Sequence, residues 1–259
     1  VGDFTNDPTK LPDNGAYLPS FFVNSKFGGE TISDFPFSLD ESGQPTIAIG
    51  RWPVNNRNDL QRILGNSLSQ AESPPEELRI FGLVDPAEES FNQTYEIMRR
   101  LFEADQPISP EIAIERFEPQ KLPESEFGFL VYFGHGSLTS WGSPPLLNTS
   151  IIKDEWRGIP LAVMQFTCLT SYFIAPDEVS LSEELLLAGV PIVYGPTHLT
   201  LPGDQWALVE SWVMGLKEKN YERIGDLIVY TWNNLPATNE ANEIRQTYIL
   251  LGDPAYRIP

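Results

Sequence analysis

The chain alternates short apolar runs with segments whose apolar residues recur at helical spacing. The apolar runs lie at 78–85, 127–134, 159–168 and 190–195, and polar residues do not alternate with apolar ones within them. Strands that are apolar on both faces are typical of parallel sheets, because helices cover both faces of such a sheet. The pattern therefore predicts an α/β fold with a mainly parallel sheet flanked by helices on both faces.

Helices are predicted between these strands. Within 88–104, Phe91, Tyr95, Met98 and Phe102 fall on one helical face, which is typical of core packing. Ser180 and Glu183 have the spacing of a capping box at the start of an apolar helix, and Gly189 ends that helix. Further helices are predicted at 55–66, 204–219 and 221–235.

The remaining segments are predicted as short strands or loops. A strand at 46–53 is stopped by Pro53, another is expected at 111–117, and residues 248–259 form a strand or extended piece. Residues 1–45 are rich in Pro, Gly, Asn and Asp, so we expect a long loop region with little regular structure. Residues 1–259 are expected to form a single domain. Because the chain opens abruptly on "VGDF", we also expect this domain to be part of a longer polypeptide.

Composition narrows the classes of function. The net charge is -19, from 36 acidic and 17 basic residues, which argues against nucleic acid or an anionic membrane as partner. Such a surface favours basic peptides, although it equally serves solubility. The single cysteine, Cys168, excludes a disulfide within the chain and any cysteine-rich zinc site. No apolar run is long enough to cross a membrane.

Two of the predicted strands end in residues that can carry chemistry. One runs into Gly134-His135-Gly136, and the other ends at Cys168, 33 positions later, which leaves room for one crossover between neighbouring parallel strands. Functional sites in such sheets form at the carboxyl ends of the strands. A lone histidine or a lone cysteine is more often structural, but both at two strand ends indicate a Cys/His dyad.

The residue types of such a dyad imply a mechanism. A thiol becomes a strong nucleophile when a nearby imidazole takes its proton, and the imidazole can later supply a proton to a leaving amine. The backbone N–H groups of Gly136 and Cys168 are the candidates for an oxyanion hole. The product would be an acyl-enzyme that water then hydrolyses.

Five stretches, in this order, resemble the gingipain-type cysteine peptidases (peptidase family C25), which are relatives of caspases and legumains. They are "VGDF" at 1–4, "IAIGRWPV" at 47–54, "YFGHGSLTSW" at 132–141, "FTCLTSYF" followed by "SLSEELLLAGVPIVYG" at 166–195, and "LLGDPAYR" at 250–257. The resemblance spans essentially the whole chain. It implies a caspase-like three-layer sandwich and a cysteine endopeptidase acting on proteins or peptides, with His135 and Cys168 as catalytic residues.

The same resemblance implies cleavage after Arg or Lys, with a carboxylate in the substrate pocket. Asp85, at the end of its strand, is one candidate, although the turn "DPAEES" explains an aspartate there equally well. Asp204 is the alternative pocket acid. Trp141 and His198 are further candidates for substrate contact, although a histidine at the position of His198 is more often an ordinary loop residue. The chain departs from the family at Pro202, near the position of a pocket tryptophan.

Other interpretations stay open at this level. A glutamate, Glu76 or Glu77, is a candidate for orienting the histidine, or both are simply solvated. No cofactor is required, and the Asp/Asn-rich segment 2–15 offers oxygen ligands suited to calcium or forms plain turns. The same fold also suits a transpeptidase or a catalytically silent binding or regulatory module within a larger assembly. The family is largely secreted, while a single thiol fits the cytoplasm equally well.

Overall fold

A seven-stranded sheet forms the centre of the computed structural model, which describes residues 18–54, 56–71, 80–103, 110–111, 128–155, 160–218 and 221–258. Its strands are β3 (Gly50–Arg51), β4 (Ile80–Val84), β5 (Pro110–Glu111), β6 (Phe129–Phe133), β9 (Ala162–Phe166), β10 (Ile192–Pro196) and β11 (Tyr248–Gly252). They lie in the order β3-β11-β10-β9-β6-β4-β5. Among the described strands of this sheet, β10 and β11 pair antiparallel, and every other neighbouring pair is parallel.

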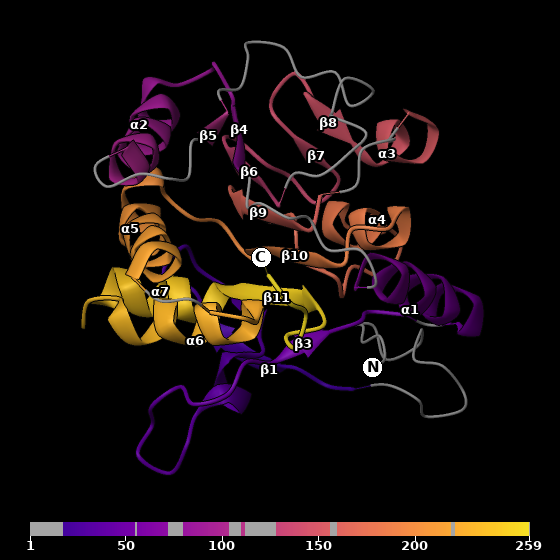
Figure 1. Ribbon diagram of the computed structural model, residues 1–259, viewed down its shortest axis with the longest axis horizontal. Coiled ribbons are helices and arrows are strands. Elements are labelled where there is room, and N and C mark those ends of the chain that lie inside the picture. The colour runs from indigo at the N-terminus through magenta and orange to yellow at the C-terminus, as the bar shows by residue number, and fades with distance from the viewer. Residues whose placement is uncertain are drawn as a thin grey trace.

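Helices cover both faces of the sheet, so the molecule has three layers (Figure 1). The helices are α1 (Arg57–Ala71), α2 (Glu89–Glu103), α3 (Thr149–Glu155), α4 (Leu181–Ala188), α5 (Pro202–Glu218), α6 (Ile224–Asn234) and α7 (Asn239–Thr247). The layer of α2, α5, α6 and α7 covers one face, and the layer of α1, α3 and α4 covers the other. No helix in the described ranges is long and apolar enough to cross a membrane.

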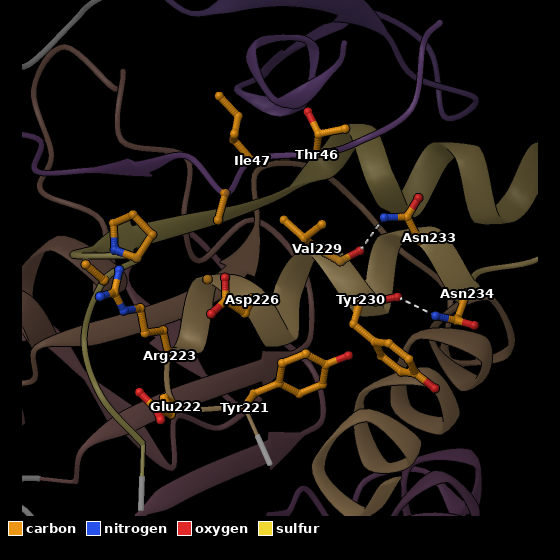
Figure 2. Close-up of a pocket in the computed structure, with 14 residues that line it drawn as sticks. Thr46, Ile47, Tyr221, Glu222, Arg223, Asp226, Val229, Tyr230, Asn233 and Asn234 are labelled. Atoms are coloured by element: carbon orange, nitrogen blue, oxygen red, sulfur yellow. Dashed lines mark hydrogen bonds between the residues drawn. The ribbon is translucent and has the colours of Figure 1, made fainter. Parts of the chain in front are cut away.

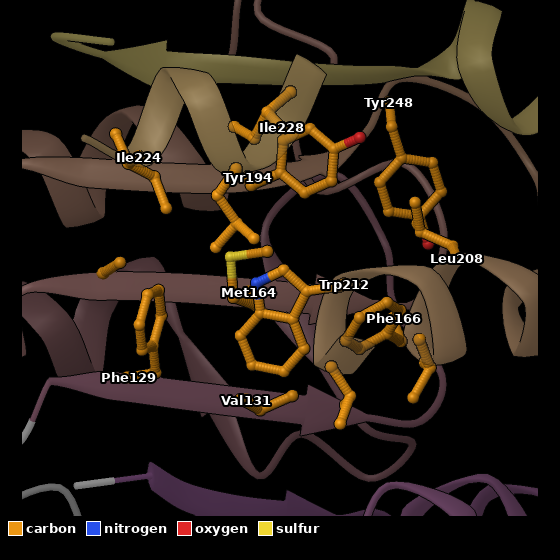
Figure 3. Packing of buried hydrophobic residues seen from close by; sticks show 14 of the residues in the cluster. Phe129, Val131, Met164, Phe166, Tyr194, Leu208, Trp212, Ile224, Ile228 and Tyr248 are labelled. Atoms are coloured by element: carbon orange, nitrogen blue, oxygen red, sulfur yellow. The ribbon is translucent and has the colours of Figure 1, made fainter. Parts of the chain in front are cut away.

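Two buried clusters of apolar side chains, one on each face, hold the layers together. In the first, Trp212 of α5 lies between helix and sheet (Figure 3), with its ring centre 5.4 Å from that of Phe129 and 6.3 Å from that of Phe102. The strands β6 and β9 are buried at every position. These two strands are therefore fixed from above and below, which is what the near-continuous apolar runs in the sequence predict.

The N-terminal segment corrects one expectation from the sequence. Within 18–45, predicted as loop, β1 (Phe21–Asn24) and β2 (Glu30–Ser33) form an antiparallel hairpin, followed by a 3₁₀ turn at Phe35–Ser38. The side chain of Thr31 in β2 donates to the carbonyl oxygen of Thr197 at 2.9 Å, so the hairpin is anchored to the loop after β10. A second small hairpin, β7 (Ser140–Trp141) with β8 (Leu147–Asn148), follows β6.

The other elements agree in type with the sequence-based prediction but differ in extent. The capping box of Ser180 and Glu183 is present at α4, and Gly189 ends that helix with φ 114°. The strand predicted at 46–53 pairs only at Gly50–Arg51, whereas the helix predicted at 55–66 continues to Ala71. Helices α3 and α7 were not predicted. The strand expected at 111–117 lies almost wholly outside the described residues.

A buried ion pair joins β3 to the N-terminal hairpin. The guanidinium of Arg51 donates to both carboxylate oxygens of Asp34, at 2.8 and 2.7 Å, and both side chains are buried. Arg51 also donates to the carbonyl oxygen of Leu18 and lies 5.0 Å from the ring centre of Phe173, in the segment after Cys168. The arginine of the "GRWP" stretch therefore has a structural role in this chain.

We expect Arg51→Met to lower the free energy of unfolding by about 3–5 kcal/mol, because it leaves the buried Asp34 carboxylate without its counter-charge. Chemical denaturation monitored by tryptophan fluorescence measures the loss. Arg57→Met, at an exposed arginine in the first turn of α1, is the matched control and should change stability by less than about 0.5 kcal/mol. A similar, small change in both variants would contradict the role assigned to Arg51.

Candidate active site

The pairing of β6 with β9 brings the ends of two strands to the same edge of the sheet. Phe133, the last residue of β6, pairs with Phe166, the last residue of β9. His135 and Cys168 each follow two residues later, so the two side chains leave the sheet at equivalent positions on adjacent strands. The N–H of Gly134 continues the contact by donating to the carbonyl oxygen of Phe166 at 3.2 Å.

Gly136 lets the two loops beyond these strands touch. A Cβ atom at this position would lie 2.2 Å from Oγ1 of Thr167 and 2.7 Å from the carbonyl oxygen of Cys168. Real Cβ atoms do not approach other atoms so closely, so any larger residue would push the His135 loop away from the Cys168 loop. The glycine after the histidine is therefore required for close approach of the two chain segments.

The backbone of His135 is held from two sides. Its N–H donates to Oδ2 of Asp85 at 3.2 Å, and its carbonyl oxygen accepts from the hydroxyl of Tyr132 at 2.8 Å. Burial and the neighbouring carboxylate of Asp85 raise the pKa of Tyr132 well above its usual range, so this hydroxyl stays protonated and keeps donating. The backbone that carries the imidazole is thereby fixed before any substrate arrives.

Asp85 has a structural position that differs from the pocket role predicted from sequence. The side chain is buried, Oδ1 accepts from the N–H of Ala87 at 2.9 Å, and Oδ2 accepts from His135. A buried carboxylate that accepts backbone N–H groups orders a turn, as the "DPAEES" alternative anticipated. Asp85 thus positions the backbone of the histidine loop.

Glu88 approaches the imidazole of His135 and was not singled out from the sequence. Its Oε1 lies 3.0 Å from Nε2 of His135, and 44% of the histidine side chain and 51% of the glutamate side chain are exposed. The ring of Phe91 packs edge-on against the imidazole at 4.9 Å and 83°. A proton held on Nε2 by Glu88 leaves Nδ1 as the nitrogen that can accept a proton.

The position of Glu88 explains why the sequence did not reveal it. Glu88 lies one residue before α2, in a turn with several acidic residues that the sequence alone does not distinguish. Its approach to His135 depends on where that helix starts. Glu76 and Glu77, the glutamates proposed from sequence to orient the histidine, lie outside the described residues.

Thr200, on the loop after β10, holds the thiol of Cys168. The N–H of Thr200 lies 3.4 Å from Sγ, and Sγ lies 3.4 Å from the carbonyl oxygen of the same residue. The amide of Gln205 fixes this contact by donating to Oγ1 of Thr200 at 2.7 Å and to the carbonyl oxygen of Thr167 at 3.2 Å. These two contacts with the backbone of Thr200 fix the position of the sulfur beside the loop that follows β10.

Two backbone N–H groups beside the thiol have no acceptor among the described residues. The bridge between Gly136 and Trp141 uses the carbonyl of His135 and the N–H of Ser137, which leaves the N–H of Gly136 outside it. The N–H of Cys168 is likewise without an acceptor within the described structure, whereas that of Leu169 donates to the carbonyl oxygen of His198. These two N–H groups are the ones that the sequence suggested for an oxyanion hole.

Trp141, predicted as a substrate contact, is fully buried instead. Its ring stacks on that of Tyr132, with centres 4.4 Å apart, and its Nε1 donates to Oε1 of Gln165 at 2.8 Å. This geometry corrects the expectation, because an indole with no exposed surface and a satisfied N–H offers nothing to a substrate. The tryptophan instead packs behind the strand that precedes His135.

His198 and Asp204 follow β10 and lie toward the same edge of the sheet as the thiol, but each contacts a side chain other than those of the dyad. Nδ1 of His198 is 3.0 Å from the hydroxyl of Ser25, which donates to the carboxylate of Glu243. Asp204, in the first turn of α5, forms an ion pair with Lys26. The structure therefore brings His135, Gly136 and Cys168 together and places His198 and Asp204 in a neighbouring polar cluster.

No metal centre accompanies this site within the described ranges, where no three His, Cys, Asp or Glu side chains gather as a metal would require. The segment 2–15, considered above for calcium, lies outside those ranges.

A separate pocket of ≈ 830 Å³ is lined by Tyr221, Arg223, Asp226 and Pro254, among others (Figure 2). Pro254 follows β11, whose last residue pairs with Ile192 at the start of β10, so the pocket lies toward the opposite end of the sheet from Cys168. It is distinct from the site that His135 and Cys168 form.

Comparison with known proteins gives a family and a fold. A model described as peptidase family C25 matches residues 1–259. The crystal structure of the Arg-specific cysteine proteinase gingipain R (RgpB) is similar with a TM-score of 0.73 at 14% identity, covering 100% of this chain and 63% of that one. No curated protein sequence matches the chain.

Two further structures are similar. A complex of the pro- and mature domains of RgpB from Porphyromonas gingivalis has a TM-score of 0.74 at 15% identity and covers 100% of this chain and 64% of that one. The Saccharomyces cerevisiae separase–securin complex has a TM-score of 0.50 at 13% identity over 73% of this chain and 13% of that one. The chain thus spans less than two thirds of the gingipain chains, and the likeness confirms the predicted caspase-like α/β fold.

Proposed function

Since the chain belongs to peptidase family C25, we propose that it hydrolyses peptide bonds within proteins through Cys168 and His135. The observation that carries the proposal is the in-register pairing of Phe133 with Phe166, together with the contact of the two loops at Gly136. Family membership implies a protein substrate, and the closeness of the two strand ends supports the roles that we assign to Cys168, His135 and the N–H group of Gly136.

The reaction then divides between the two side chains. Cys168 Sγ, as the thiolate, attacks the carbonyl carbon of the scissile bond, and a C–S bond forms. His135 carries the thiol proton to the leaving amine as the C–N bond breaks, which leaves an acyl-enzyme. Water then attacks the thioester, His135 takes a proton from that water, and the thiol is restored as the acid product leaves.

The oxyanion of the tetrahedral intermediate is assigned to the N–H groups of Gly136 and Cys168. Both are without an acceptor among the described residues, and both belong to loops that Gly136 allows to touch. Backbone donors that need no reorganisation stabilise developing negative charge efficiently, and losing one such donor typically slows catalysis by about 10²–10³-fold.

Cleavage after Arg or Lys remains the specificity that the resemblance implies for this chain. Gingipain R is an Arg-specific cysteine proteinase. The net charge of -19 on the present chain would attract basic segments of a substrate. At 14% identity, the structural similarity to gingipain R supports the fold of this chain. A preference for Arg or Lys additionally requires a carboxylate that the substrate side chain can reach.

We expect Cys168→Ser and His135→Ala each to abolish hydrolysis of fluorescently labelled casein, because each removes one of the two groups that move electrons and protons. The release of fluorescence measures the rate, and circular dichroism verifies that each variant is folded. Casein hydrolysis by Cys168→Ser at the wild-type rate would refute the proposed function.

Glu88 is expected to act as a positioning residue for the imidazole. Because an exposed ion pair contributes about 0.2–1 kcal/mol, Glu88→Gln should lower kcat by about 1.4- to 5-fold while KM and the thermal midpoint stay unchanged. Steady-state kinetics on a cleaved peptide measures this split. Glu89→Gln, at the adjacent exposed position, is the matched control and should leave kcat unchanged. Equal effects of the two substitutions would contradict the role of Glu88.

A further inference from the structure

The carboxylates around the dyad already have partners in this chain. Asp85 accepts two backbone N–H groups, Glu88 faces the imidazole of His135, and Asp204 is paired with Lys26. An arginine or lysine of a substrate would have to share a carboxylate with one of these groups to gain a counter-charge. None of these three carboxylates is free of a partner within the chain.

Large apolar side chains, in contrast, are exposed next to the thiol. Leu199 and Leu201 flank Thr200, whose N–H touches Sγ, and their side chains are 41% and 49% exposed. Trp206, one turn into α5, is 39% exposed. Single exposed apolar residues are ordinary, but three within eight positions beside a thiol are candidates for a binding surface.

Trp206 links this patch to the histidine. Its Nε1 donates to Oγ1 of Thr94 in α2 at 2.8 Å, which fixes the indole between the two helices. Thr94 lies three residues after Phe91, on the same helical face, and Phe91 packs against His135. The exposed indole of Trp206 is therefore attached to α2, the helix whose buried Phe91 packs against the imidazole.

The chemistry decides which side of the scissile bond meets this surface. His135, at the end of β6, must reach the leaving amine, so the amine side of the substrate lies over β6. The acyl side then extends from Cys168 toward β10, the strand on the other side of β9. The loop after β10 carries Leu199 and Leu201, so these residues face the side chain that precedes the scissile bond.

We infer that the residue preceding the cleaved bond is apolar, such as Leu, Met or Phe, and is held by Leu199 and Leu201. This inference rests on the proposed function and replaces Arg or Lys as the preferred residue. Burial of an apolar side chain of this size gives about 10–100-fold in reactivity over a side chain that stays in water.

The test uses peptidyl acyloxymethyl ketones that differ only in the residue next to the reactive group: Leu, Phe, Arg or Lys. The rate of covalent labelling of Cys168 is followed by intact-protein mass spectrometry, with His135→Ala as the reference for unassisted thiol reactivity. Labelling by the Leu or Phe compound at least about 10-fold faster than by the Arg or Lys compound supports the inference. Faster labelling by the Arg or Lys compound overturns it and leaves the peptidase proposal standing.

If none of the four compounds labels wild type faster than it labels His135→Ala, the peptidase proposal fails and the inference fails with it. A charge variant sharpens the positive result. Leu201→Glu should slow labelling by the Leu compound by at least about fivefold and speed labelling by the Lys compound. Leu68→Glu, at a 63% exposed leucine of α1 on the other face of the sheet, is the matched control and should change neither rate. An unchanged profile in Leu201→Glu would overturn the assignment of this residue.

Discussion

The register of β6 on β9 is the constraint on which the site depends. Because Phe133 and Phe166 pair and both strands run in the same direction, the two residues that follow each strand emerge side by side. A slip of one residue would turn every side chain of a strand to the opposite face and would separate His135 from Cys168. Complete burial of both strands makes such a slip costly, so the core of the molecule sets the geometry of its edge.

Contacts outside the sheet add a second layer of restraint on the same edge. Asp85 and Tyr132 hold the backbone of His135, and Thr200 and Gln205 hold the Cys168 loop. The N-terminal hairpin supports the loop of Thr200 in turn, through Thr31. Most of the polar groups near the dyad therefore serve to position backbone. The large apolar side chains exposed on the loop after β10 and at the start of α5 are those of Leu199, Leu201 and Trp206.

The sequence predicts the parts of this arrangement that depend on local pattern. Continuous apolar runs identified β4, β6, β9 and β10, and helical spacing identified α2, since parallel sheets and their covering helices leave those patterns in any chain. His135 and Cys168 stood out because they followed two such runs. The likeness to the gingipain-type peptidases agreed with the fold and the family that the comparisons show.

The features that the sequence did not reveal depend on tertiary contacts. The β1–β2 hairpin has an exposed first strand and is anchored to a loop more than 160 residues away, so no local pattern announces it. Asp85 and Trp141 were candidates for substrate contact. In the structure, backbone N–H groups bind the carboxylate of Asp85, and Tyr132 stacks on the ring of Trp141. Glu88 is one of several acidic residues in one turn, and only the packing of α2 against β6 determines which of them contacts the imidazole of His135.

The most direct test of the account is a crystal structure of the chain after reaction with a peptide aldehyde that ends in leucine. We expect Sγ of Cys168 to be bonded to the aldehyde carbon, with the former carbonyl oxygen about 2.7–3.1 Å from the N–H groups of Gly136 and Cys168. The imidazole of His135 should lie within hydrogen-bond reach of the adduct. An unmodified thiol, or an adduct whose oxygen and leucine both point away from His135 and Leu201, would contradict the account.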